Sequence, residues 1–126
     1  MEEEENKNNE LPFENLNIEE HIKSINNNVM KNNPDLNDNI MEDLRLLNCK
    51  IATFKQAKTD VDYRNRELIN FLIENKKTEY DNNFLAKLDI EYAKRMIAYK
   101  QLIIIVGEIN NLASILAPNF PPLKIE

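Results

Sequence analysis

The chain has almost no glycine, and its prolines lie outside one long central stretch. Gly107 is the only glycine among 126 residues, and every proline falls before Asp35 or after Ala117. Glycine provides tight turns and loops that cradle phosphate groups, whereas proline ends helices. The composition therefore excludes a glycine-rich nucleotide-binding loop and leaves residues 35–117 free to form long helices.

Cysteine and histidine are each present once, as Cys49 and His21. A single cysteine excludes an internal disulfide and suggests a reducing compartment. A protein metal site needs three or four well-spaced ligands, which these residues do not supply. No serine or cysteine lies in a recognisable pattern with the histidine, so a nucleophile–base pair is not expected. We therefore expect no catalytic, cofactor-binding or metal-binding residues, and no enzyme activity.

Long apolar runs and strong positive charge are also missing. The longest apolar run, residues 102–106, is too short to cross a bilayer, and the acidic N-terminus lacks the apolar core of a secretory signal. Of the formal net charge of −6, residues 1–20 contribute −7, which leaves the remainder near +1. A protein that binds nucleic acid needs a basic surface. These features predict a soluble cytoplasmic protein that does not bind nucleic acid.

The two ends of the chain differ from its middle in composition and in the spacing of their apolar residues. Residues 1–17 are rich in glutamate and asparagine and are expected to be a disordered acidic tail. Apolar residues at helical spacing predict a short amphipathic helix over residues 18–30, which Pro34 prevents from continuing. Asp35 or Asn37 can cap the helix that follows. The proline-rich tail, residues 117–126, is expected to end the last helix and to be disordered.

The central region, residues 37–116, carries two series of residues spaced alternately four and three apart, as in a coiled coil. We call these two series the first and second seams. Lys58 and Asn65 are polar residues inside the first seam, and they either fix helix register and partner choice or mark a weakly packed middle. The first seam consists of Ile40, Leu44, Leu47, Ile51, Phe54, Lys58, Val61, Asn65, Leu68, Leu72 and Asn75. The second seam consists of Leu85, Leu88, Tyr92, Arg95, Tyr99, Leu102, Val106, Ile109, Ala113 and Leu116.

The two seams are out of phase by one residue across the polar segment 76–83. That segment holds either a local overwinding of one helix or a turn between two helices. Because no glycine or proline forces a turn, the sequence favours a continuous or gently broken helix over a tight hairpin. The predicted fold is all-α, a long coiled-coil helix or a broken helix pair preceded by a short helix.

Apolar seams of this length are expected to be covered by other coiled-coil chains in a hetero-oligomer, because so short a chain folding on itself would leave them exposed. Met96, Ile103 and Ile104 widen the second seam enough to contact more than one neighbour. The predicted partner-interface residues are Leu44, Leu47, Ile51, Phe54, Val61, Leu68, Leu72, Leu85, Leu88, Tyr92, Tyr99, Leu102, Ile103, Val106, Ile109 and Leu116.

Two stretches resemble the coiled-coil segments of the Snapin family of SNARE-associated proteins. The first is LNCKIATFKQAKTDV at residues 47–61, and the second is residues 88–116, centred on MIAYKQLIIIV at residues 96–106. The resemblance implies a subunit of a complex that builds lysosomes and related organelles. It further implies SNARE proteins among the partners, and a location on the cytosolic face of endosomal or lysosomal membranes reached only through partners.

Helical periodicity by itself leaves two other hypotheses open. One is a coiled-coil subunit of a nuclear or cytoskeletal assembly, such as a kinetochore or a transcription mediator. The other is a self-contained antiparallel helical bundle that acts as a binding module. A compact monomer in solution would favour the bundle, whereas the proteins that co-purify with the chain would separate the two kinds of assembly.

Overall fold

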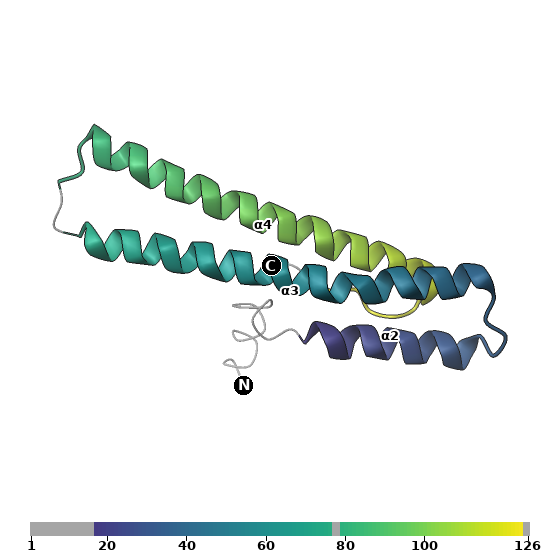
Figure 1. Ribbon diagram of the computed structural model, residues 1–126. Coiled ribbons are helices and arrows are strands. Elements are labelled where there is room, and N and C mark those ends of the chain that lie inside the picture. Colours follow the sequence, from purple (N-terminus) through teal and green to yellow (C-terminus); the bar gives the residue numbers. More distant parts are fainter. Residues whose placement is uncertain (1–16, 77–78, 125–126) are drawn as a thin grey trace.

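The computed structural model describes residues 17–76 and 79–124, and within them it contains three helices and no strand. They are α2 (Ile18–Asn32), α3 (Asp38–Glu74) and α4 (Asn82–Leu116). Figure 1 shows α3 and α4 as a long antiparallel hairpin, with α2 beside the half of the hairpin farther from its connecting loop. The all-α prediction with a short first helix is confirmed, while the predicted disorder of residues 1–16 falls outside the described residues.

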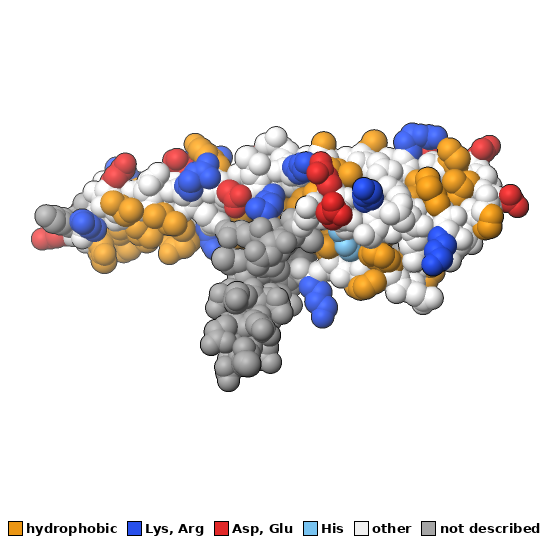
Figure 2. Space-filling model, turned by 90° about the horizontal axis from the view of Figure 1, so that it is seen from below, with side chains coloured by type: hydrophobic (Ala, Val, Ile, Leu, Met, Phe, Trp, Pro, Cys, Tyr) orange, Lys and Arg blue, Asp and Glu red, His pale blue; other side chains and the backbone are white. Residues whose placement is uncertain are grey.

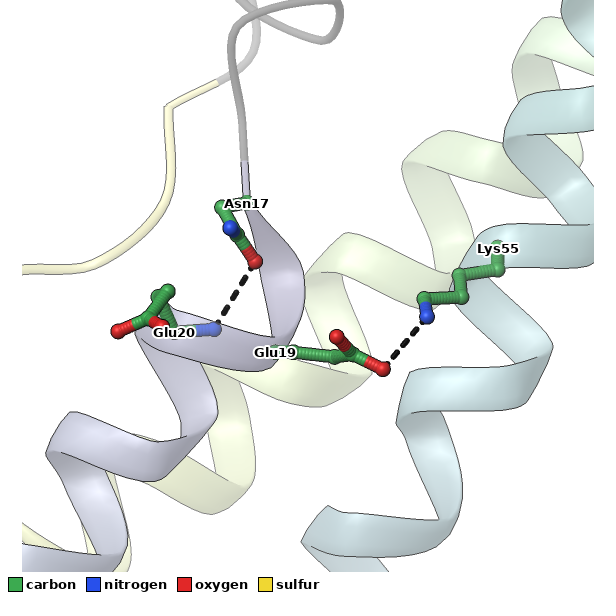
Figure 3. A network of polar contacts seen from close by, with 4 residues as sticks. All are labelled: Asn17, Glu19, Glu20 and Lys55. Carbon is green, nitrogen blue, oxygen red and sulfur yellow. Dashed lines mark hydrogen bonds and ion pairs between the residues drawn. The ribbon is translucent and has the colours of Figure 1, made fainter.

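Each helix begins at a side chain that accepts a hydrogen bond from a backbone amide of the first turn. Asn17 Oδ1 accepts from the amide of Glu20 at 3.1 Å, as drawn in Figure 3. Asn37 Oδ1 accepts from Ile40 at 2.8 Å, and Asp81 Oδ1 accepts from Phe84 at 2.9 Å. Such caps satisfy amide groups that have no partner inside the helix. Of the two candidates in the sequence, Asn37 rather than Asp35 caps α3.

The expectation of a continuous or gently broken helix across residues 76–83 is wrong, because the chain reverses there. Helix α3 ends at Glu74, and Asn75 is its C-cap residue; the amide N–H and the side-chain Nδ2 of Asn75 both donate to the carbonyl of Phe71, at 3.1 and 2.8 Å. Beyond the turn, the ring of Phe84 stacks on Phe71 at 5.5 Å and on Tyr80 at 4.8 Å. These contacts close the hairpin without a glycine or a proline.

The two seams pack mainly against each other, so the expectation that a chain this short cannot cover them also needs correction. Leu47 and Phe54 on α3 and Leu102, Val106 and Ile109 on α4 are almost completely buried in one core. Each such side chain contributes roughly 1.5–3 kcal/mol when fully buried. Antiparallel pairing thus provides within one chain much of the apolar contact that was expected from partners.

Helix α2 completes the core over part of the hairpin. Ile22, Ile25 and Val29 are buried there, on the face predicted by their spacing. Glu19 Oε2 lies 2.6 Å from Lys55 Nζ, and Asn26 Nδ2 donates to Asn48 Oδ1 at 2.9 Å. Residue numbers therefore rise along α2 as they fall along α3. Helix α2 runs antiparallel to α3, and its first turn lies beside Lys55 (Figure 3).

Residues 117–124 fold back onto the bundle, which corrects the expectation of a disordered C-terminal tail for this part. Helix α4 ends at Leu116, before the first proline, as predicted. Phe120 and Leu123 then pack against the core, and the ring of Phe120 meets His21 edge-on at 5.5 Å. Asn110 donates to the carbonyl of Leu123 at 2.9 Å and accepts from its amide at 2.8 Å.

Candidate partner-binding surface

The predicted interface residues divide into buried and exposed sets. The buried set holds the hairpin together and is not available to a partner: Leu44, Leu47, Phe54, Val61, Leu68, Leu102, Val106, Ile109 and Leu116. Three others, Ile51, Leu88 and Tyr99, are half-buried. The exposed set consists of Leu72, Leu85, Tyr92 and Ile103. Three of these four lie in the half of the hairpin nearer the loop.

Asn65 of the first seam and Arg95 of the second seam contact each other in the part of the hairpin beyond the first turn of α2. Arg95 Nε donates to Asn65 Oδ1 at 2.6 Å, and its guanidinium lies 4.8 Å from the centre of the Tyr99 ring. Asn65 Nδ2 also approaches the Tyr99 hydroxyl at 3.5 Å. Unpaired polar groups in such a position would cost free energy. These contacts pair polar groups of α3 and α4 with each other, whereas Lys58, the other polar residue inside the first seam, pairs with Asp62 on its own helix at 3.4 Å.

One side of the hairpin is covered by α2 at one end and uncovered at the other. Asn48 and Lys55, seven residues apart on α3, both contact α2. Residues seven apart lie on nearly the same side of a helix, so the next positions in this series, Asp62 and Ile69, face the same way. Beside Ile69, however, no described element packs on α3 other than α4.

At the uncovered end this side is apolar. We call these residues the loop-end patch: Ile69, Leu72 and Ile73 from α3, and Leu85, Leu88 and Tyr92 from α4. The α4 members continue the series of Arg95 and Tyr99, both of which contact Asn65. Ile69 and Ile73 are 54% and 57% exposed, and Leu85 and Tyr92 are 44% and 47% exposed. Figure 2, which views the molecule from below Figure 1, shows apolar side chains gathered toward the loop end.

Helix α4 carries a second exposed apolar series on another side. It consists of Ile90, Ile97, Ile104 and Ile115, spaced by seven and eleven residues, and each is more than half exposed. A helix that is apolar on all sides is typical of a buried environment. Only one side of α4 is buried within the described residues, against α3 and α2. We call this series the outer stripe.

Sequence reasoning missed most of the outer stripe, of which it named only Ile104, and two of the six residues of the loop-end patch. Ile69, Ile73, Ile90 and Ile97 were absent from the predicted interface because they lie off the heptad seams. The signal that identifies them is the apolar character of positions between the seams. It is strongest in α4, where isoleucine recurs every seven residues from Ile90 to Ile104.

No group of three histidine, cysteine or acidic side chains is close enough to hold a metal ion within the described parts of the chain. Among the described helices, none is long and apolar enough to cross a membrane. Cys49 is exposed and unpaired. His21 is half-buried with Nε2 lacking a hydrogen-bond partner among the described residues, and this burial lowers its pKa.

Comparison of the chain with protein-family models, with curated proteins and with solved structures finds no match.

Proposed function

We propose that this protein is a non-enzymatic structural subunit of a hetero-oligomeric complex of helical chains. The observation that carries the proposal is the apolar character of α4 on several sides, of which the described residues of its own chain bury one. Burial of exposed apolar surface is the main driving force of protein association, and contiguous apolar patches on a small monomer commonly mark interaction sites.

The proposal differs from the expectation drawn from the sequence in what the partners contact. The buried seam residues hold the chain's own hairpin together, so partners bind the outer stripe and the loop-end patch instead. A subunit of this design folds before it assembles, and it contributes a preformed hairpin to a larger helical bundle.

We further propose that the complex acts in endosome and lysosome biogenesis, vesicle trafficking or SNARE-linked membrane fusion. This part rests on the resemblance of residues 47–61 and 88–116 to the Snapin family. In this proposal, the protein acts on the cytosolic face of these membranes and associates with them only through its partners.

The test is affinity purification of the tagged full-length chain from its own cells, followed by mass spectrometry and co-expression of the proteins found. We expect a stoichiometric set of helical proteins that co-elute as one assembly and fractionate with endosomal membranes. Ile97→Asp combined with Ile104→Asp should release partners while helix content remains, because both side chains are exposed in the isolated chain. A chain that stays monomeric and retains no stoichiometric partner would refute the proposal.

A further inference from the structure

Helices α3 and α4 extend beyond the first turn of α2. The side of the hairpin on which α2 packs therefore continues toward the loop. Helix α2 packs on both α3 and α4, and its first turn lies beside Lys55. From Lys58 to Glu74, α3 rises a further 24 Å or so, at about 1.5 Å per residue. Along this length α3 and α4 remain paired, but the described chain supplies no third helix.

The residues exposed along this length are of the kind that α2 covers elsewhere. At the covered end, Ile22 and Ile25 of α2 are fully buried in one core with Leu44 of α3 and with α4. At the uncovered end, Ile69, Ile73 and Tyr92 present apolar side chains to solvent from the same side. The loop-end patch is therefore continuous with an interface that already binds a helix.

The charges at the border of the loop-end patch favour an acidic partner. Arg66 lies eleven residues, close to three turns, beyond Lys55 on the same side of α3, and it forms no ion pair with any described residue. Arg95 also borders the patch and is held by Asn65, not by a carboxylate. Of the acidic residues nearby, Asp62 is paired with Lys58 at 3.4 Å and Glu91 with Lys94 at 3.7 Å. Glu67 and Glu74 lie about 100–120° around α3 from Lys55, which leaves Asp89 on this side. The arrangement parallels the covered end, where Glu19 of α2 meets Lys55 (Figure 3).

We infer that the loop-end patch binds one amphipathic helix of a partner protein, laid in line with α2 so that it continues the three-helix bundle toward the loop. The bound helix is about 16 residues long, as 24 Å requires. It carries apolar residues at three- and four-residue spacing, and carboxylates on the edge that faces Arg66. This inference rests on the proposed function, since it names the chemistry of one partner of the same subunit.

A second copy of this chain fits the patch less well. Its loop-end patch would bring another Arg66 and another Arg95 to the interface, and like charges in contact oppose association. A second hairpin would also present two helices where the covered end of the bundle accommodates one, namely α2.

The experiment uses the full-length chain and a designed helical peptide with leucine and isoleucine at its core positions and glutamate on both edges. A second peptide carries lysine at the same edge positions. Fluorescence anisotropy measures binding of each labelled peptide to the native chain and to the variants Ile69→Asp, Tyr92→Asp and Ile97→Asp. Ile97 is the matched control, because it is an apolar side chain at least as exposed as Ile69 and Tyr92 and belongs to the outer stripe.

We expect the glutamate-edged peptide to bind more tightly than the lysine-edged one, with the preference reduced by Arg66→Glu. Ile69→Asp and Tyr92→Asp should each weaken binding by about tenfold or more, whereas Ile97→Asp should change it by less than about twofold. Equal binding to all three variants, or a preference for the lysine-edged peptide, would overturn the inference.

Two further results would assign the patch to another occupant and would also overturn the inference. One is concentration-dependent self-association of the full-length chain, measured by sedimentation equilibrium and abolished by Ile69→Asp. The other is peptide binding that appears only after residues 1–16 are deleted. If cellular partners co-purify with Ile69→Asp and Tyr92→Asp as well as with the native chain, the proposed function stands and the assignment of this patch fails.

Discussion

At the scale of single residues, the stability of the hairpin core depends on a few large buried side chains. Phe54 is 1% exposed and packs between the helices, whereas Leu46, eight residues earlier on the same helix, is 45% exposed. Removal of a buried aromatic side chain loses its apolar burial and leaves a cavity that the neighbours fill only in part. The two positions therefore distinguish residues that hold the chain together from residues on its surface.

We expect Phe54→Ala to lower the free energy of unfolding by about 3–5 kcal/mol. Leu46→Ala, the control, should change it by about 0.5 kcal/mol or less. Urea denaturation followed by circular dichroism measures both variants. Similar losses for the two would show that the side of α3 assigned to the core is wrong.

A second prediction at this scale concerns His21, whose pKa is lowered because burial disfavours its charged form. The unfolded chain then binds a proton more readily than the folded chain, so folding stability falls as the pH falls below about 6.5 and levels off below the lowered pKa. The native protein should unfold at lower urea concentration at pH 5 than at pH 7, to an extent reduced in His21→Leu. The same pH dependence in both proteins would assign it to carboxylate groups instead.

At the scale of the elements, an N-cap marks where α4 begins after the turn. Asp81 lies at the start of α4, where its carboxylate accepts from the Phe84 amide and interacts favourably with the positive end of the helix. Asp89 is an exposed aspartate inside the same helix, away from the first turn.

We expect Asp81→Ala to cost about 1 kcal/mol of stability, in the range of measured N-cap substitutions. Asp89→Ala should be neutral or slightly stabilising, because alanine has the higher helix propensity. Thermal denaturation of both variants provides the comparison. An unchanged midpoint for Asp81→Ala would mean that the cap does not limit the stability of this turn.

At the scale of the whole molecule, the antiparallel hairpin brings together residues that a continuous helix would separate widely. Lys50 Nζ lies 2.8 Å from Glu108 Oε1, although the two residues are 58 positions apart. In an uninterrupted helix that separation would be about 87 Å. A zero-length chemical cross-link between these side chains therefore reports the topology directly.

We expect carbodiimide treatment of dilute protein to join Lys50 and Glu108 within one chain, detected as a linked peptide pair in the monomer band. Lys50→Gln removes the reactive amine and should abolish that pair, while the pair formed by Lys55 and Glu19 persists. A Lys50–Glu108 link found only in covalent dimers would indicate that helices are exchanged between chains.

Much of the local structure follows from the sequence itself. Helices were expected where glycine and proline are absent, and α2 and α3 begin at Asn17 and Asn37, close to their expected starts. The start of α4 at Asp81 was not predicted, because the sequence favoured a helix that continues across residues 76–83. The buried faces of α2 and α3 follow the apolar spacing, because a residue at position i lies on the same side as those at i+3, i+4 and i+7. Such properties depend on neighbours within a few turns, so they can be predicted without the tertiary structure.

Tertiary structure alone decided which surface is left for a partner. A heptad seam buries the same residues whether the facing helix comes from the same chain or from another, so periodicity could not assign the seams to the chain's own hairpin. The reversal near residues 75–81 depends on packing across the turn, such as Phe71 against Phe84, which no local preference shows. Once α3 and α4 cover each other and α2 covers one end, Ile69, Tyr92 and Ile97 stay exposed, because burial depends on where three helices lie in space.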